Sequence, residues 1–131
     1  MSSNAEYVLD SSAVLALLGL EPGHEHLTGL LERSIISAVN LAEIANKLAR
    51  ETPSVPAVRQ LLAHMELTVV EWTEDLAYLS AEFTQFNKSH GLSLGDRACL
   101  TLAKHLRATA ITSDRAWRRI PSLGVRIMIF R

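Results

Sequence analysis

The chain has 131 residues, of which 48% are hydrophobic and 21% charged, and its formal net charge is −1. This composition is that of an ordinary soluble protein, and the length fits a single domain, residues 1–131, with one hydrophobic core. No apolar run approaches the ~20 residues that a membrane span needs, and a lone cysteine excludes an internal disulfide and a cysteine-rich zinc site. A signal peptide's basic-then-apolar order is missing, so we expect a cytoplasmic protein with a disordered lead-in at residues 1–5.

The first half of the chain alternates between short apolar segments and helical patterns. Residues 7–9 predict a buried strand, and Ser11 and Ser12 can cap a helix that ends at Gly19. The pattern then predicts a second helix through Arg33, a strand at 34–39, a helix over 41–48 that stops before Pro53, and a helix from Pro56 to Met65.

The second half continues this alternation. A third strand is predicted at 67–70, and a long helix that begins after Thr73 runs through His90 and ends at Gly91. Next come a helix over 94–106 capped by Ser93, a fourth strand at 109–112 and a fifth at 125–130. Strand–helix alternation predicts an α/β fold with a mostly parallel, roughly five-stranded central sheet and helices on both faces.

Four carboxylates are expected to meet at one edge of this sheet. Asp10 follows the first predicted strand, Asp114 follows the fourth, and Glu43 lies in the first turn of the helix after the second. Asp96 is in the first turn of the helix before the fourth strand, and it joins the others if that helix begins at the same edge. In parallel sheets, ligand-binding groups gather beyond the carboxyl ends of the strands.

Such a cluster has a specific chemical consequence. Carboxylates that share a cleft raise each other's pKa values, and a bound divalent cation removes this penalty. All-oxygen ligands suit Mg²⁺ or Mn²⁺. A metal ion held there can activate water and stabilise charge on a phosphoryl oxygen.

Each acid also has a local structural interpretation, which is the commoner one when the acid is taken singly. These interpretations are a helix cap for Asp10, an ion pair with Lys47 for Glu43, a capping box with Ser93 for Asp96, and a turn for Asp114. Four acids at one sheet edge together favour the metal site.

Four stretches, spread over nearly the whole chain, carry a family resemblance. They read YVLDSSAVLALL, ISAVNLAEIANKL, GLSLGDRACLTLAKHL and AITSDRAWRRI. In this order they resemble the PIN domain family, and specifically the VapC-type toxins of bacterial toxin–antitoxin pairs. The resemblance implies a three-layer α/β/α fold and a Mg²⁺-dependent endoribonuclease, with Mn²⁺ as a possible substitute. It also implies a homodimer that is silenced by a cognate antitoxin, with transfer RNA as the leading substrate.

The resemblance places the family's functional positions on particular residues of this chain. The acidic positions, both catalytic and metal-binding, fall on Asp10, Glu43, Asp96 and Asp114, and the family's hydroxyl position falls on Thr112. Ser11 can orient a metal-bound water and Asn40 can support Glu43, although we expect both to act as helix caps.

The arginines near the last two acids suggest a substrate-binding surface. From residue 97 to the last residue there are eight Lys/Arg and one acid, a net charge of +7. Such a segment is typical of a basic face that binds a polyanion, and a solvated face without a partner is the alternative. We predict RNA binding by Arg118 and Arg119, while Arg97 and Arg115 can bind phosphate or anchor the neighbouring carboxylates.

Two other classes of protein stay open. A receiver-like phosphoacceptor domain has a similar length and clustered acids, but its acceptor would follow a middle strand, where this chain has Glu71 and Trp72. A PIN-like module that binds RNA or protein without cutting has the same sequence features, and an activity assay separates the two.

Overall fold

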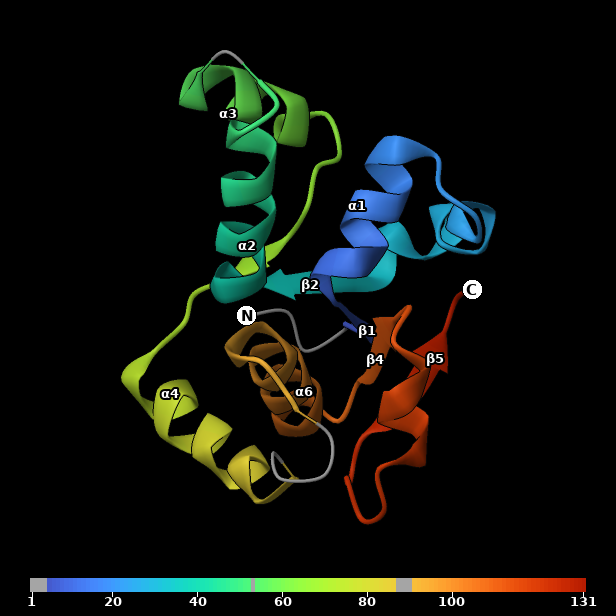
Figure 1. The fold of residues 1–131 in the computed structure, drawn as a ribbon, viewed down its shortest axis with the longest axis vertical. Helices are drawn as coiled ribbons and strands as arrows, with labels where there is room; N and C mark the ends of the chain where they lie inside the picture. Colours follow the sequence, from blue (N-terminus) through green and yellow to red (C-terminus); the bar gives the residue numbers. More distant parts are fainter. Residues whose placement is uncertain (1–4, 53, 87–90) are drawn as a thin grey trace.

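The computed structural model describes residues 5–52, 54–86 and 91–131, which form one parallel sheet between two layers of helices (Figure 1). Its strands are β1 (Tyr7–Leu9), β2 (Ser34–Ser37), β3 (Val69–Val70), β4 (Thr109–Thr112) and β5 (Arg126–Ile129). The strand order is β3-β2-β1-β4-β5, and all neighbouring strands are parallel. The predicted α/β class with a five-stranded, three-layer arrangement is therefore confirmed.

Helices cover both faces of the sheet. The α-helices are α1 (Ser11–Gly19), α2 (Ala38–Ala49), α3 (Val55–Ala63), α4 (Glu74–Ser80) and α6 (Leu94–Leu106). The 3-10 turns are η1 (His24–His26), η2 (Thr28–Arg33), η3 (Ala81–Phe86) and η4 (Arg115–Arg119). In Figure 1, α1, α2 and α3 lie on one side of the sheet, and α4 and α6 lie on the other. Within the described ranges, no helix has the length and apolarity to cross a membrane.

The hydrophobic core has two halves because successive side chains of a strand point to opposite faces. Val8 of β1 packs with Cys99 and Leu102 of α6, and Leu9 packs with Val14 of α1 on the other face. All five side chains are at most 1% exposed. Helices α1 and α6 are thus fixed against opposite faces of the same central strand, and this determines where their N-termini lie.

The segment predicted as a second helix through Arg33 consists of two 3-10 turns instead. Its backbone hydrogen bonds span three residues, as from Leu27 N to His24 O and from Leu30 N to Leu27 O, both 3.0 Å or shorter. A glycine at position 29 lowers the helix propensity of an already short segment, so the tighter turn is sufficient here.

The boundary between strand β2 and helix α2 lies earlier in the chain than predicted. The strand ends at Ser37, because the Ser37 side chain accepts a hydrogen bond from Asn40 N and caps α2. The predicted long helix from Thr73 is also shorter, since its α-helical part ends at Ser80 and continues as η3. The last residues of that prediction, 87–90, lie outside the described residues.

Candidate active site

The four predicted acids lie around the carboxyl edge of the central strands. Asp10 directly follows β1, and its N–H donates to Ile111 O of β4 at 2.9 Å, so the ends of the two strands are side by side. Asp114 lies two residues beyond β4, and Asp96 is in the first turn of α6. Glu43 is in the second turn of α2 rather than the first, because α2 begins earlier than predicted.

Asp10 is the most enclosed of these carboxylates, with 8% of its surface exposed. Its Oδ2 accepts hydrogen bonds from Ser12 Oγ and from Thr112 Oγ1, both at 2.9 Å. Burial raises the pKa of Asp10 to about 6, the two hydroxyls oppose that rise, and the charge of Asp96 adds to it. Thr112, the predicted family hydroxyl, is fully buried and holds Asp10 directly.

Glu43 is held by the two residues that were expected to be helix caps. Ser11 Oγ donates to Glu43 Oε1 at 2.6 Å, and Asn40 Nδ2 donates to the same oxygen at 3.0 Å. Asn40 is completely buried, and it also donates to Gly95 O at 3.0 Å, which ties α2 to the start of α6. Both capping predictions are wrong: the cap of α2 is Ser37, and the Ser11 side chain points across to α2.

Gly95 is a site residue that the sequence analysis did not identify. A Cβ atom built at this position would overlap the carboxylate of Glu43. The absence of a side chain therefore lets Glu43 lie against the first turn of α6. The only sequence signal was a glycine in the first turn of a helix. Glycine has a low helix propensity, so its presence there suggests that a side chain is not tolerated at this position.

Asp96 and Asp114 both make the local contacts of their structural interpretations. Asp96 completes a capping box with Ser93, in which each side chain bonds the other residue's backbone N–H at 2.9 and 3.1 Å. Burial raises the pKa of Asp96, Ser93 opposes the rise, and the charges of Asp114 and Glu43 add to it. Asp114 is exposed and caps η4, since its Oδ1 accepts from Ala116 N at 3.0 Å.

The donor chemistry of this cluster fits a hard divalent cation. All four side chains offer oxygen, and none takes part in the ion pairs formed among the described residues. Burial raises the pKa values of Asp10 and Asp96, and the charges of neighbouring acids add to that rise, a penalty that a bound cation relieves. In the part of the chain described here, however, no three such groups converge on one point. Each carboxylate is turned towards its own hydroxyl, amide or backbone N–H partner.

Three of the four predicted substrate-binding arginines share one cleft. Arg115, Arg118 and Arg119 line it together with Arg131, and Arg115 Nε donates to Arg131 O at 3.1 Å. Arg97 is not among the residues that line this cleft. It is half-buried in α6, where its Nη1 donates to a backbone carbonyl at 3.4 Å.

A parallel α/β sheet with carboxylates from several elements at its strand ends defines the class of this protein. Residues 7–123 match the family described as PIN domain, so the chain belongs to the PIN domain family. No curated protein matches it by sequence. Membership of this family removes the support for a receiver-like phosphoacceptor.

Solved structures with similar folds cover nearly the whole chain. VapBC2 of Rickettsia felis, bound to a DNA fragment from its promoter, matches with TM-score 0.72 and 17% identity over 95% of this chain and 98% of that chain. DNA-bound VapBC of Salmonella typhimurium matches with TM-score 0.72 and 20% identity over 97% and 99%. VapBC-1 of nontypeable Haemophilus influenzae matches with TM-score 0.70 and 20% identity over 95% and 97%. At these identities the likeness shows a shared fold.

Proposed function

We propose that this PIN domain is a metal-dependent endoribonuclease and the toxin component of a VapBC-type toxin–antitoxin pair. The observation that carries the proposal is the group of carboxylates from four separate elements around one sheet edge, two of them with raised pKa values. Full-length likeness to toxins solved in VapBC complexes supports the same assignment.

In this proposal, Asp10, Glu43, Asp96 and Asp114 are the catalytic residues and would hold Mg²⁺, or Mn²⁺ in its place. The bound ion would supply water activation and charge stabilisation for hydrolysis of an RNA phosphodiester, with transfer RNA as the substrate class. The reaction leaves a 3′-hydroxyl and a 5′-phosphate.

The neighbouring side chains prepare these carboxylates. Hydroxyl donors at Asp10 favour its ionised form, because hydrogen bonds to a carboxylate lower its pKa. Ser11 and Asn40 fix the position of one Glu43 oxygen and leave the second oxygen for another partner. Thr112, Ser11 and Asn40 are therefore positioning residues. In this proposal Arg118 and Arg119 bind substrate phosphates, and Arg97 and Arg115 bind phosphate or anchor the neighbouring carboxylates.

The direct test is RNA cleavage by the purified chain. We expect cleavage with Mg²⁺ or Mn²⁺, loss of cleavage in EDTA, and recovery when the metal is restored, since none of the four acids is ion-paired within the described residues. Gel analysis of a labelled transfer RNA and mapping of its new ends measure this. Full activity in EDTA contradicts the mechanism, and RNA binding without cleavage under any metal identifies a non-cleaving module.

An inhibitory partner is proposed on two features of the surface. The carboxylate cluster is complementary to a basic side chain, and an arginine can bind carboxylates bidentately. A cleft of about 480 Å³ between α2 and α3 has an apolar lining that includes Leu41, Ala45, Val58 and Leu62. An amphipathic antitoxin helix fits such a groove.

We further propose, from the family resemblance, that the chain forms a homodimer and acts in the cytoplasm.

Growth of cells that make this chain tests the toxin assignment. Expression of the chain alone is expected to stop growth, whereas co-expression with the adjacent small open reading frame restores it. The Asp96→Asn variant serves as the control. We expect cells to make it at the same level as the wild-type chain and to keep growing. Normal growth with abundant soluble wild-type chain rules out a toxin, even if the chain cleaves RNA in vitro.

A further inference from the structure

Two hydroxyl groups converge on one oxygen of the Asp10 carboxylate, and each of them makes a second hydrogen bond. Ser12 Oγ donates to Asp10 Oδ2 at 2.9 Å and accepts from Ser113 N at 3.1 Å. Thr112 Oγ1 donates to the same oxygen at 2.9 Å and accepts from Asp114 N at 3.1 Å. Two consecutive backbone N–H groups are therefore tied to Asp10, each through one hydroxyl.

The chemistry of a hydroxyl fixes the direction of both chains of hydrogen bonds. A hydroxyl has one hydrogen to donate and two lone pairs that accept, whereas an ionised carboxylate only accepts. The Ser12 hydrogen therefore goes to Asp10, and a lone pair remains for Ser113 N. Hydrogen bonds to a charged acceptor are stronger than those between neutral groups, so the carboxylate holds each hydroxyl firmly.

Ser12 and Thr112 differ in what they join. Thr112 ends β4 and accepts from the backbone two positions further on, so its bond to Asp114 N shapes the turn locally. Ser12 is in the first turn of α1 and bonds Ser113 across 101 positions. It therefore fixes the segment between β4 and η4 to the helix that follows β1.

The segment that Ser12 holds carries Asp114, an exposed acid. Asp114 Oδ1 accepts from Ala116 N at 3.0 Å, a bond that orients the carboxylate relative to η4. That bond does not set the distance to the other acids. Beyond the end of β4, the bonds at Ser113 N and Asp114 N direct the backbone, and the first of them depends on Ser12.

The first turn of α1 thus serves two acids besides Asp10. Ser11 Oγ donates to Glu43 Oε1 at 2.6 Å, and Ser12 Oγ holds the segment that carries Asp114. Successive side chains of a helix are about 100° apart, so neighbouring serines reach α2 and the β4–η4 segment on different sides of α1.

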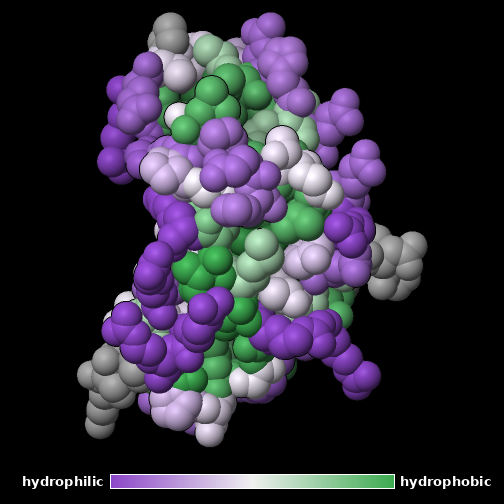
Figure 2. Space-filling view, turned by 90° about the vertical axis from the view of Figure 1, so that its right-hand side faces the viewer, coloured by the Kyte–Doolittle hydropathy of each residue, from purple (hydrophilic) through white to green (hydrophobic). Residues whose placement is uncertain are grey.

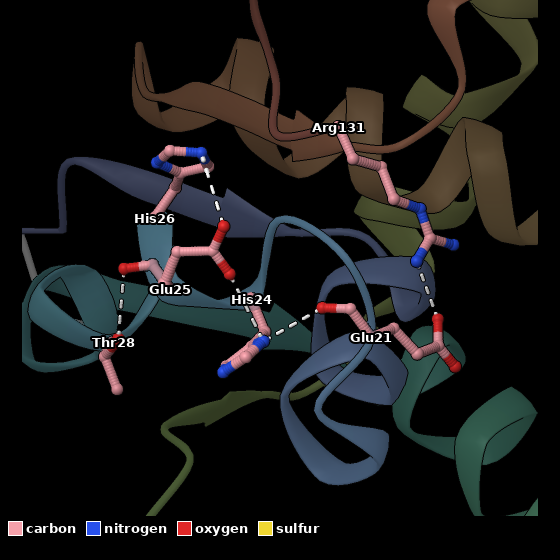
Figure 3. A network of polar contacts seen from close by, with 6 residues as sticks. All are labelled: Glu21, His24, Glu25, His26, Thr28 and Arg131. Atoms are coloured by element: carbon pink, nitrogen blue, oxygen red, sulfur yellow. Dashed lines mark hydrogen bonds and ion pairs between the residues drawn. The ribbon is translucent and has the colours of Figure 1, made fainter.

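Helix α1 is fixed independently of Ser12. Arg131 Nη1 donates to Glu21 Oε1 at 2.8 Å, and His24 Nδ1 lies 2.9 Å from Glu21 O, as Figure 3 shows. These contacts join the loop after α1 to η1 and to the segment after β5. Val14 and Ala16 within the helix are completely buried. Loss of the Ser12 hydroxyl therefore leaves α1 in place and acts on the β4–η4 segment.

Apolar packing around α1 adds to this support. The half of the core that contains α1 also includes Leu27 and Phe130, with Tyr7, Leu30 and Met128 partly buried against it. Figure 2 views the molecule from the side on which η1, η2 and the end of β5 lie in Figure 1, and it shows an apolar strip between hydrophilic borders. Burial of this surface holds the three segments together without a contribution from Ser12.

We propose that Ser12 is a positioning residue for Asp114. Its hydroxyl joins the Ser113 N–H to the Asp10 carboxylate and so holds Asp114 where both acids can bind the same divalent cation. The inference rests on the proposed metal-dependent nuclease and adds to it the residue that connects the acids at the ends of β1 and β4. Hydrogen bonds that orient metal ligands in this way contribute to metal affinity.

Hydrogen exchange of single amides, followed by NMR in EDTA, tests the bond itself without metal. In Ser12→Ala, the Ser113 amide is expected to exchange about 10-fold faster, whereas the Asp114 amide, which Thr112 holds, changes by less than ~3-fold. Equal acceleration of both amides, or no change at Ser113, overturns the proposal.

Binding of Mn²⁺ without RNA, measured by titration calorimetry, tests the consequence for the acids. We expect Ser12→Ala to raise the Kd for Mn²⁺ by about 10-fold, and Ser12→Thr, which keeps the hydroxyl, to stay within ~3-fold of wild type. Ser34→Ala is the matched control, because it removes a buried hydroxyl at the amino end of β2, where Ser34 Oγ donates to Leu30 O at 2.7 Å. An unchanged Kd in Ser12→Ala, or an equal rise in Ser34→Ala, overturns the proposal.

A double variant identifies the acid through which Ser12 acts. In an Asp114→Asn background, Ser12→Ala is expected to change the Kd for Mn²⁺ by less than ~3-fold, because both changes remove the same interaction. An effect of full size in that background shows that Ser12 acts through Asp10 alone and overturns the proposal. Glu21→Gln, which loosens the other end of α1, leaves the Kd unchanged if the effect belongs to Ser12 rather than to the docking of α1.

Failure of this inference and failure of the nuclease function give different results. Wild type that binds Mn²⁺ in a Ser12-dependent manner but does not cleave RNA refutes the nuclease and leaves Ser12 as a positioning residue of a metal site. Cleavage by wild type with an unchanged Mn²⁺ affinity in Ser12→Ala refutes the role of Ser12 alone. Wild type that binds no Mn²⁺ overturns both.

Discussion

Replacing Asp10 by asparagine is expected to lower RNA cleavage by about 100-fold or more, because several kcal/mol of metal-based charge stabilisation is lost and ~1.4 kcal/mol corresponds to tenfold. Asparagine has the same shape, and its side-chain oxygen can still accept from Ser12 and Thr112. Asp96→Asn is expected to behave in the same way. Single-turnover cleavage rates at saturating Mg²⁺ measure the effect.

The stability of the Asp10 variant is the control that separates chemistry from folding. In EDTA, the raised pKa of about 6 means that the folded protein binds a proton more tightly at Asp10 than the unfolded chain does. Stability therefore falls as pH rises from about 4 to about 6, and the whole penalty, on the order of 2–3 kcal/mol, is present above that window. Asp10→Asn removes the penalty, so its Tm at pH 8 is higher and its pH profile flatter.

Added Mg²⁺ reverses this difference, because only wild type gains stability from the ion. Asp75→Asn, in an exposed acid at the start of α4, is the matched control and changes neither cleavage nor the pH profile. A variant of Asp10 that cleaves at the wild-type rate contradicts its assignment as a catalytic residue. A Tm of Asp10→Asn at pH 8 that is no higher than the Tm of wild type in EDTA contradicts the burial argument.

The fold and the location of the four acids could be predicted because both follow from periodicity and from one rule of parallel sheets. Strand residues such as Val8 and Leu9 alternate between two buried faces, and an acid directly after a strand must lie at its carboxyl end. The predicted catalytic and metal-binding roles of these acids stay predictions.

Finer features depend on contacts between distant residues, and no local pattern contains them. Ser37 and Asn40 are both good capping residues, and only the end of β2 decides that Ser37 is the cap. Ser11 bonds Glu43 across 32 positions, and Arg131 pairs with Glu21 across 110. The cleft lined by Arg115, Arg118, Arg119 and Arg131 likewise exists only because β5 returns beside η4.

Gly95 gives the most discriminating test of the site's geometry. In Gly95→Ala, the new methyl group occupies the place of the Glu43 carboxylate. That carboxylate is the far end of an exposed, flexible side chain, so it can turn into solvent at little cost to the fold. We expect stability to stay the same or to rise by up to about 1 kcal/mol, since alanine is the better helix former. Cleavage is expected to fall by about 10–100-fold, as for other residues that orient metal ligands.

Gly29→Ala is the matched control, because a Cβ at Gly29 meets nothing within 4 Å. The collision itself is tested by Gly95→Ala combined with Glu43→Asp, whose shorter side chain makes room and restores part of the lost rate. If the alanine variant acts through Glu43, it also has little further effect in a Glu43→Gln background, because both changes remove the same interaction. Wild-type cleavage by Gly95→Ala shows that the observed position of Glu43 is not required, and a strictly additive double variant shows that Gly95 acts by another route.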